Sequence, residues 1–111
     1  MGRQAKKFSV GCLMMIKFKS YEDEKYMYLS VEGHADHEQG FDRVCGMVSV
    51  LAQSALYGVS RYATALDVTA CAGTLKFKCR KTDMIGIPIM NTCIEGIEQV
   101  KAQFPHCFCE V

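Results

Sequence analysis

The sequence predicts an α+β domain of two layers, in which a mostly antiparallel sheet carries two helices packed on one face. Three observations predict this fold class. Segments that alternate apolar and polar residues occur in pairs, as in β-hairpins. Two longer segments repeat apolar residues at three- and four-residue steps, which is typical of helices that bury one side. The predicted order, strand–strand–helix–strand–strand–helix–strand, allows both helices to cover the same face of one sheet.

The first hairpin is expected at the start of the chain. Residues 12–19 alternate apolar and polar side chains, and residues 26–33 are aromatic and β-branched. The acidic segment 20–25 between them is the predicted connection. The second strand therefore delivers His34 to one end of the sheet.

A helix is expected from Arg43 to about Gly58 or Arg61, with Asp42 as its N-cap. Aspartate is a preferred N-cap residue because its carboxylate accepts a hydrogen bond from a backbone amide of the first turn. The apolar stripe of this helix consists of Val44, Val48, Leu51, Ala55 and Val59. A helix so apolar on one side should lie against the sheet.

A second hairpin is expected from residues 65–71 and 75–80, which flank the turn Ala72-Gly73. The second arm has a basic face that consists of Lys76, Lys78 and Arg80. Ordinary solvent exposure explains this face, and a contact surface for an acidic or nucleic-acid partner is the alternative.

The last helix is expected over roughly residues 89–103. Pro105 ends it, because proline cannot continue a helix, and residues 106–111 are expected to close as a short strand. No repeat, linker or low-complexity segment interrupts the chain, so residues 1–111 are expected to form a single domain.

Composition restricts the classes of function. Half of the 111 residues are apolar and 23% are charged, which is typical of a globular protein. The net charge of +1 argues against a dominant nucleic-acid or membrane footprint. No segment approaches the roughly 20 apolar residues of a membrane helix, and none fits a signal peptide. The seven cysteines are therefore expected to be reduced, in a cytoplasmic protein.

The segment 33–49 carries most of the chemistry. His34 ends a strand, a polar loop flanked by Gly33 and Gly40 follows, and Cys45 then lies near the start of a helix. A helix N-terminus favours a thiolate, and a histidine within reach can take the thiol proton. Such a pair suffices for nucleophilic attack on an acyl carbon. For Cys45 taken alone, a buried core cysteine is the simpler interpretation, because cysteine is so often buried.

The neighbours of this pair have two interpretations each. Asp42 caps the helix or orients the imidazole. Ser49, one turn after Cys45 on the same helix face, bonds back to a carbonyl or bonds near the thiolate. Gly46 would let a substrate backbone approach, with the amides of Cys45 and Gly46 as oxyanion donors. His37 is an alternative base, but no strand positions it.

A second group of candidate ligands lies near the end of the chain. Cys107 and Cys109 stand beside His106, yet strand alternation alone would place both thiols on one face. Structural zinc needs four ligands, and the sequence offers no second cluster. We therefore expect no metal and no cofactor, and a thiol redox or metal protein built on these two cysteines is an alternative function.

The run Gly33-His34-Ala35, then Gly40 and Asp42, then Val44-Cys45 and Ser49, resembles the Prp family of bacterial ribosomal-processing cysteine proteases. The resemblance covers most of the chain. It implies an endopeptidase that removes the N-terminal extension of a large-subunit ribosomal protein. It also implies a mobile loop over the site, for which Gly33 and Gly40 would be the hinges, and a homodimer.

Carried over residue by residue, the resemblance makes His34 the general base and Cys45 the nucleophile, with Asp42 and Ser49 as supporting residues. Two departures concern loop geometry and fine specificity. Gly46 replaces an expected alanine, and the loop after His34 is about one residue shorter than expected.

The main alternative is a non-catalytic ribosome- or RNA-associated module that uses the face of Lys76, Lys78 and Arg80. The protease hypothesis itself expects a peptide substrate, no membrane contact and no direct nucleic-acid binding. Loss of Cys45 separates the two, because it would leave a binding module unaffected.

Overall fold

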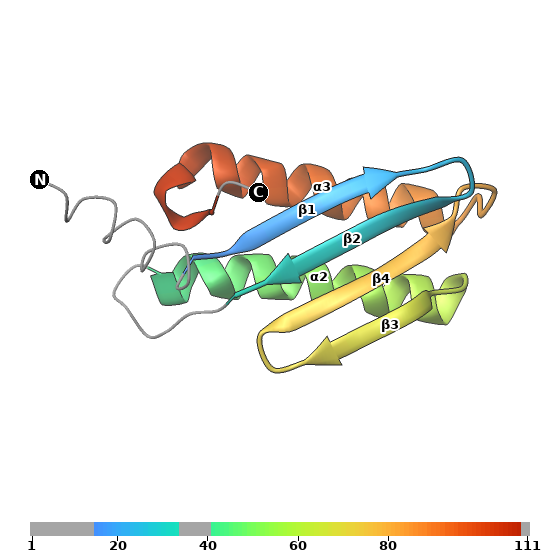
Figure 1. Cartoon of the computed structure of the whole chain (residues 1–111), viewed down its shortest axis with the longest axis horizontal. Coiled ribbons are helices and arrows are strands. Elements are labelled where there is room, and N and C mark those ends of the chain that lie inside the picture. The colour runs from blue at the N-terminus through green and yellow to red at the C-terminus, as the bar shows by residue number, and fades with distance from the viewer. Residues whose placement is uncertain (1–14, 34–40, 110–111) are drawn as a thin grey trace, which may run out of the picture.

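The computed structural model describes residues 15–33 and 41–109, with only the backbone described for Phe41 and Asp42. Four strands form one sheet in the order β1-β2-β4-β3, and every neighbouring pair is antiparallel (Figure 1). The strands are β1 (Lys17–Glu22), β2 (Tyr26–Glu32), β3 (Leu66–Cys71) and β4 (Thr74–Arg80).

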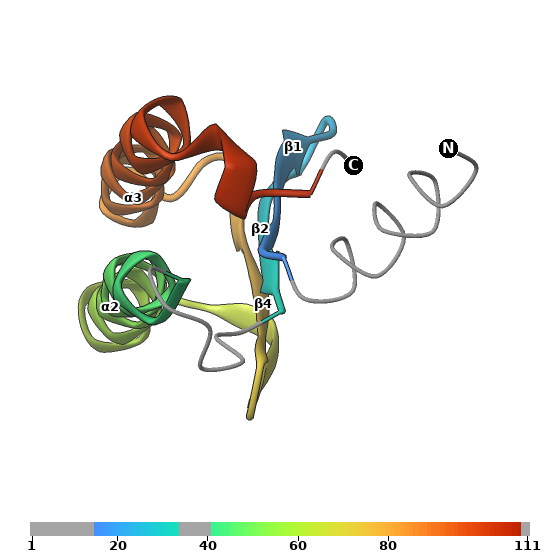
Figure 2. The same cartoon turned by 90° about the vertical axis from the view of Figure 1, so that its left-hand side faces the viewer.

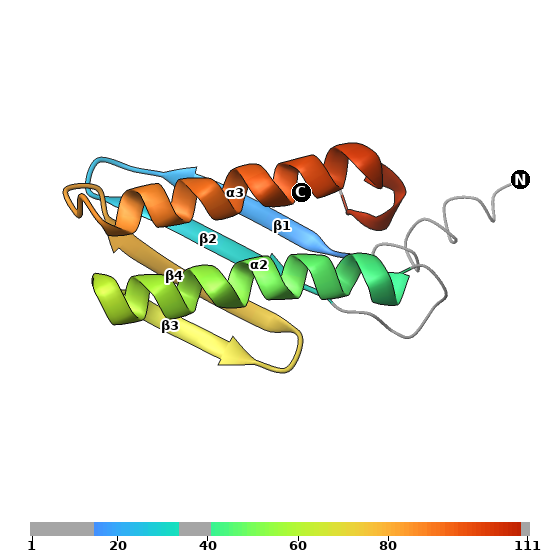
Figure 3. The ribbon, with the colours of Figure 1, turned by 180° about the vertical axis from the view of Figure 1, so that it is seen from behind.

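Both helices lie on the same face of this sheet, side by side (Figure 2). They are α2 (Phe41–Tyr62) and α3 (Gly86–Gln103), and a short 3₁₀ helix, η1 (Pro105–Cys107), follows α3. Seen from behind, the two helices run across the strands in front of the sheet (Figure 3). The predicted α+β fold of two layers, with both helices on one face, is confirmed.

The core fills the space between the helices and the sheet. Alternate strand residues point into it, as the period of two requires. Among the largest fully buried side chains are Ile16, Leu29, Val48, Val59, Cys79, Met90 and Ile97. The buried stripe of α2 contains four of the five residues predicted for it, and Leu51 is partly buried at its margin.

The first strand begins and ends later than the sequence predicts, since β1 covers Lys17–Glu22 rather than residues 12–19. The polar residues 20–22, predicted as connection, continue β1, and the turn contains only residues 23–25. Two interactions explain the difference. The Tyr21 ring stacks on Tyr28 across the strands, with centroids 4.5 Å apart, and Asp23 Oδ1 accepts hydrogen bonds from the amides of Lys25 and Tyr26 at 2.8 Å. An aspartate that closes the turn in this way lets the strands extend to it.

The end of the chain also differs from the prediction. Helix α3 begins at Gly86, three residues earlier than expected, because a proline within the first turn of a helix sacrifices no hydrogen bond. The predicted closing strand over residues 106–111 is wrong for its described part. There η1 forms instead, and only Phe108 makes a single parallel bridge, to Ile16.

Candidate active site

Cys45 lies near the start of α2, as the sequence predicts, but further into the helix than expected. Helix α2 begins at Phe41, so Asp42 is its second residue rather than its N-cap. An acidic residue is favoured in the first helical turn as well as at the cap, and the sequence does not distinguish the two positions. Cys45 is therefore the fifth residue of α2, and only 7% of it is exposed.

The earlier helix start bears on the expected oxyanion donors. In a helix that begins at Phe41, the amides of residues 41–43 have no intrahelical partner. The amides of Cys45 and Gly46 lie beyond them and donate to carbonyls one turn earlier. Their role as oxyanion donors stays a prediction, and it requires the first turn of α2 to open.

Gly33 holds the backbone immediately before His34. Its amide donates to the carbonyl of Gly73 in the β3–β4 turn at 3.0 Å, and its φ is +95°. A Cβ at this position would overlap the carbonyl oxygen of Met15. Only glycine accepts both conditions without strain. Gly33 thus fixes the point where the chain leaves β2, and His34, Gly40 and the loop between them lie outside the described residues.

A groove of about 700 Å³ runs along one side of α2, between that helix and the β3–β4 hairpin. Gly33 and Ser49 lie in its lining at the end near Cys45, which is one helical turn before Ser49. Further along, the helix contributes Ala52, Gln53, Leu56, Tyr57 and Ser60. The predicted nucleophile therefore lies one helical turn from the end of the groove that Ser49 lines.

The opposite wall of the groove was not predicted from the sequence. It consists of residues 70–75, which are small or apolar: Ala70, Cys71, Ala72, Gly73, Thr74 and Leu75. A signal existed on the helix side, because Ser49, Gln53, Tyr57 and Ser60 recur at helical steps beside the buried stripe. The small residues of the hairpin turn carried no comparable pattern.

Two of the candidate site positions on α2, Ser49 and Gly46, are exposed. Ser49 is exposed and lines the groove, so its side chain is available to a ligand there. Gly46 is exposed too, and a Cβ added to it would meet no atom of residues 15–33 or 41–109 within 4 Å. Among the described residues, the space that the sequence predicts beside Gly46 is therefore open.

The other described cysteines are of three kinds. Cys71 is exposed in the groove wall. Burial, and then the neighbouring Asp83 carboxylate, raise the pKa of Cys79 to about 11, and burial alone raises the pKa of Cys93 to about 11. Cys107 and Cys109 are buried, and burial raises the pKa of Cys107. Thiols with a raised pKa are poor nucleophiles at neutral pH.

Neither a metal cluster nor a membrane helix is found in the described part of the chain. Within residues 15–33 and 41–109, no three His, Cys, Asp or Glu side chains are arranged to hold a metal ion. No described helix is long and apolar enough to cross a membrane. The backbones of Cys107 and Cys109 instead hold the start of the sheet, since the carbonyl of Cys107 accepts from Ile16 at 3.0 Å and the amide of Cys109 donates to Ile16 at 2.8 Å.

A small α+β domain with a cysteine near the start of a helix, beside a groove of peptide size, has the features of a cysteine peptidase. The family model described as cysteine protease Prp matches residues 15–108. The chain belongs to that family and is therefore a cysteine peptidase by family.

Solved structures share the fold. A crystal structure of the essential ribosomal processing protease Prp from S. aureus with a substrate peptide superposes with a TM-score of 0.74 at 19% identity, covering 86% of this chain and 96% of that chain. The same protein with a covalently linked product peptide gives a TM-score of 0.72 at 18% identity over the same shares of the two chains. SMU.848 from Streptococcus mutans gives 0.63 at 20% identity, covering 86% and 94%. Among proteins of curated function, no sequence matches the chain.

Proposed function

We propose that this chain is a single-domain cytoplasmic cysteine endopeptidase that removes the N-terminal extension of a large-subunit ribosomal protein. The observation that carries the proposal is the position of Cys45. It lies one helical turn before Ser49, at the end of the groove where Gly33 leads into His34. Membership of the Prp family, and the peptides bound to the S. aureus protein of the same fold, support a peptide as the occupant of that groove.

In the proposed mechanism, Cys45 is the nucleophile and His34 the general base. Cys45 Sγ attacks the scissile carbonyl carbon as the imidazole takes the thiol proton. The C–N bond then breaks when His34 gives that proton to the leaving amine, which leaves a thioester on Cys45. Water, deprotonated by His34, hydrolyses the thioester and regenerates the thiol.

The surrounding residues support this chemistry through charge and position. The N-terminus of α2 carries the positive end of the helix dipole, which favours a thiolate and a developing oxyanion nearby. We assign supporting roles to Asp42 and Ser49. Asp42 belongs to the first turn of α2, and Ser49 lines the groove one turn beyond Cys45. Gly33 and Gly40 flank the loop that carries the base.

The occupant of the groove is proposed to be the residues of the extension on one side of the scissile bond. The groove walls combine small side chains with Leu56, Tyr57 and Leu75, so an extended segment with apolar side chains fits them. The family resemblance also implies a homodimer, and sedimentation of the purified chain tests that part separately.

The direct test is incubation with the organism's own ribosomal protein that carries the extension, followed by intact-mass analysis. One cut that releases the extension supports the proposal. The matched control is Cys93→Ala, which removes a thiol from α3, outside the groove lining. Processing that continues in Cys45→Ala, or that stops equally in a folded Cys93→Ala protein, would contradict the assignment of the nucleophile.

A further inference from the structure

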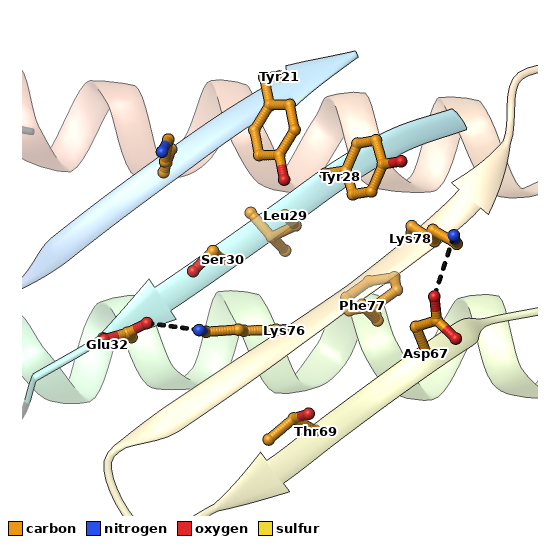
Figure 4. A pocket seen from close by; sticks show the side chains of 11 residues that line it. Tyr21, Tyr28, Leu29, Ser30, Glu32, Asp67, Thr69, Lys76, Phe77 and Lys78 are labelled. Atoms are coloured by element: carbon orange, nitrogen blue, oxygen red, sulfur yellow. Dashed lines mark ion pairs between the residues drawn. The ribbon is translucent and has the colours of Figure 1, made fainter. Parts of the chain in front are cut away.

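The face of the sheet opposite the helices carries a row of tyrosines and lysines. Both helices lie on the other face, so no described helix covers these side chains (Figure 2). Strand pairing brings Tyr21 of β1, Tyr28 of β2 and Lys78 of β4 into adjacent positions. Lys76 continues the same face along β4 (Figure 4), and the strand register places Lys19 on it as well, opposite Ser30. These five residues are referred to below as the tyrosine–lysine face.

The aromatic rings and ammonium groups of this face contact one another in a continuous series. Lys19 Nζ lies 5.5 Å from the centroid of the Tyr21 ring, which stacks on Tyr28 at 4.5 Å. Lys78 Nζ lies 5.6 Å from the Tyr28 centroid and 3.9 Å from that of Tyr26. The contacts hold the rings upright on the sheet, and half of Tyr21 remains exposed. Ordered rings of this kind lose little conformational freedom when a ligand stacks on them.

Charge on this face is unbalanced towards the positive. Five basic side chains of the strands point outwards, against the carboxylates of Glu32, Asp67 and, from the β1–β2 turn, Asp23, which accepts a hydrogen bond from the Tyr28 hydroxyl at 2.8 Å. The basic ones are Lys17, Lys19, Lys76, Lys78 and Arg80. The whole chain, by comparison, has a formal net charge of only +1. The sheet therefore concentrates basic residues that are dispersed in the sequence.

The ion pairs on this face do not prevent the lysines from binding an anion. Lys76 Nζ lies 2.8 Å from Glu32, with both side chains partly exposed, and Lys78 Nζ lies 2.9 Å from Asp67, whose side chain is 76% exposed while that of Lys78 is 19% exposed. Exposed ion pairs contribute little to stability, so exchanging a carboxylate for a phosphate costs little. The same pairing raises the pKa of both lysines, which keeps them charged at neutral pH.

A shallow hollow of about 340 Å³ lies in the middle of the face. Ser30 of β2 lies between Lys19 and Lys76 in the strand register, and Thr69 lies on β3, on the far side of β4 from the stacked tyrosines (Figure 4). The hollow is lined by the two stacked rings, by three lysines, by these two hydroxyl groups and by the carboxylates of Glu32 and Asp67. A nucleotide presents the complementary groups: a flat base, a phosphate and hydrogen-bonding edges.

We propose that the tyrosine–lysine face binds single-stranded RNA, with a base stacked against Tyr21 and phosphates held by Lys19, Lys76 and Lys78. Single-stranded nucleic acid is recognised by this combination of aromatic stacking and basic side chains, and four-stranded sheets with exposed aromatics are one of its platforms. This binding site is distinct from the peptide groove, which lies on the helix side of the sheet, and it does not depend on the proposed peptidase activity.

Two other occupants fit less well. A second copy of the chain would bring one basic face against another, and like charges would oppose that contact. An acidic protein segment matches the lysines, but it offers no ring system for the stacked tyrosines. RNA satisfies both features.

The test is fluorescence anisotropy of the full chain with a labelled single-stranded RNA of about 12 nucleotides, titrated between about 50 and 200 mM salt. We expect Tyr21→Ala to weaken binding at least about fivefold, from the loss of one stacked base. Tyr21→Phe keeps the ring and should bind as the wild type does. The matched control is Tyr62→Ala, which removes an exposed tyrosine from the end of α2.

The lysines are tested by the salt dependence. Lys76→Gln should weaken binding and reduce the slope of log K against log salt by about one, while Lys101→Gln on α3 leaves both unchanged. Absence of RNA binding at about 50 mM salt would overturn the proposal. Equal effects of Tyr21→Ala and Tyr62→Ala would overturn it too. If poly-glutamate competes fully and Tyr21→Ala has no effect, the face binds acidic protein instead and the RNA assignment is wrong.

Discussion

Both helices begin close to a cysteine. Cys45 is the fifth residue of α2, and the Cys79 thiol of β4 lies against Gly86, the first residue of α3, where an added Cβ would overlap the sulfur. The N-terminus of a helix favours a thiolate in general. Proximity to a helix start would therefore favour a thiolate at both Cys45 and Cys79, but the side chains around the two helix starts differ.

The start of α3 is capped by a single residue, Asp83. Asp83 Oδ1 accepts hydrogen bonds from the amides of Ile85 at 3.1 Å and Gly86 at 2.8 Å, and the Asp83 carbonyl accepts from Ile87 at 3.0 Å. Pro88, the third residue of α3, has no amide hydrogen. Cys79 Sγ donates to Asp83 Oδ2 at 3.5 Å. The Asp83 carboxylate thus accepts two of the amides of this helix end and disfavours a thiolate at Cys79, so position beside a helix start does not by itself make a cysteine reactive.

The largest expected effect concerns the start of α2. Cys45→Ala should reduce cleavage of the extended ribosomal protein by roughly 10³-fold or more, because no other described thiol lies at that helix start. Cys79→Ala should leave cleavage by the folded protein unchanged, although it removes a buried side chain. Mass analysis of product formation over time measures both. Equal loss in the two variants would mean that the two helix starts do not differ in function.

The next effect is a difference in thiol reactivity. At about pH 6, with a substrate-derived peptide present, Cys45 should react with iodoacetamide roughly tenfold faster than exposed Cys71, since the helix end and His34 favour its thiolate. Cys79 and Cys93 should react last, because a pKa of about 11 leaves them protonated. Peptide mapping after brief labelling gives the order. Labelling of Cys71, Cys107 or Cys109 before Cys45 would contradict the assignment of the nucleophile.

A third effect concerns the approach to the candidate site. Gly33→Ala should lower the free energy of unfolding by about 1–3 kcal/mol, because the positive φ and the Met15 carbonyl both exclude a Cβ. It should also reduce cleavage, since His34 follows directly. Urea titration and the cleavage assay measure the two effects.

The matched control for stability is Gly46→Ala. A Cβ fits there without a contact within 4 Å, so this helical position should gain up to about 1 kcal/mol. A Gly33→Ala protein as stable as Gly46→Ala would show that residue 33 tolerates a side chain, and its proposed role as a fixed point before His34 would fall.

How far the sequence predicts the molecule depends on the range of the interactions. Strand alternation and the apolar stripe of α2 are local patterns, and both predicted the fold. The start of α3 was missed because Pro88 and Gly86 suggest a break, whereas Asp83 stabilises that start from three residues earlier. The predicted closing strand over residues 106–111 is wrong in its described part because residues 106–109 form a ladder bridge only at Phe108.

The candidate site divides in the same way. The helical pattern and the family resemblance were enough to select Cys45 and Ser49. In the structure, Ser49 lines one end of the groove and Cys45 lies one helical turn before it. The wall formed by residues 70–75 depends on the sheet order β1-β2-β4-β3, which brings the β3–β4 turn beside Gly33. No periodicity in the sequence encodes that order.

The smallest effect is the pH dependence at the start of α3. Hydrogen bonds from the backbone amide of Gly86 first, and then from Cys79 and other donors, hold the pKa of Asp83 below its usual value. A carboxyl with a lowered pKa contributes stability that is present above its unfolded pKa of about 3.9 and is lost as the pH falls through the folded pKa. Asp83→Asn should therefore lower the free energy of unfolding by at most about 1 kcal/mol at pH 7, since asparagine still caps the helix. The curves of stability against pH for the variant and the wild type should converge below about pH 4.

The same variant should lower the pKa of Cys79, because a nearby negative charge is removed. Urea titrations from pH 3 to 7, followed by alkylation of Cys79, measure both, and parallel curves with unchanged labelling would show that the Asp83 carboxylate does not distinguish the two helix starts.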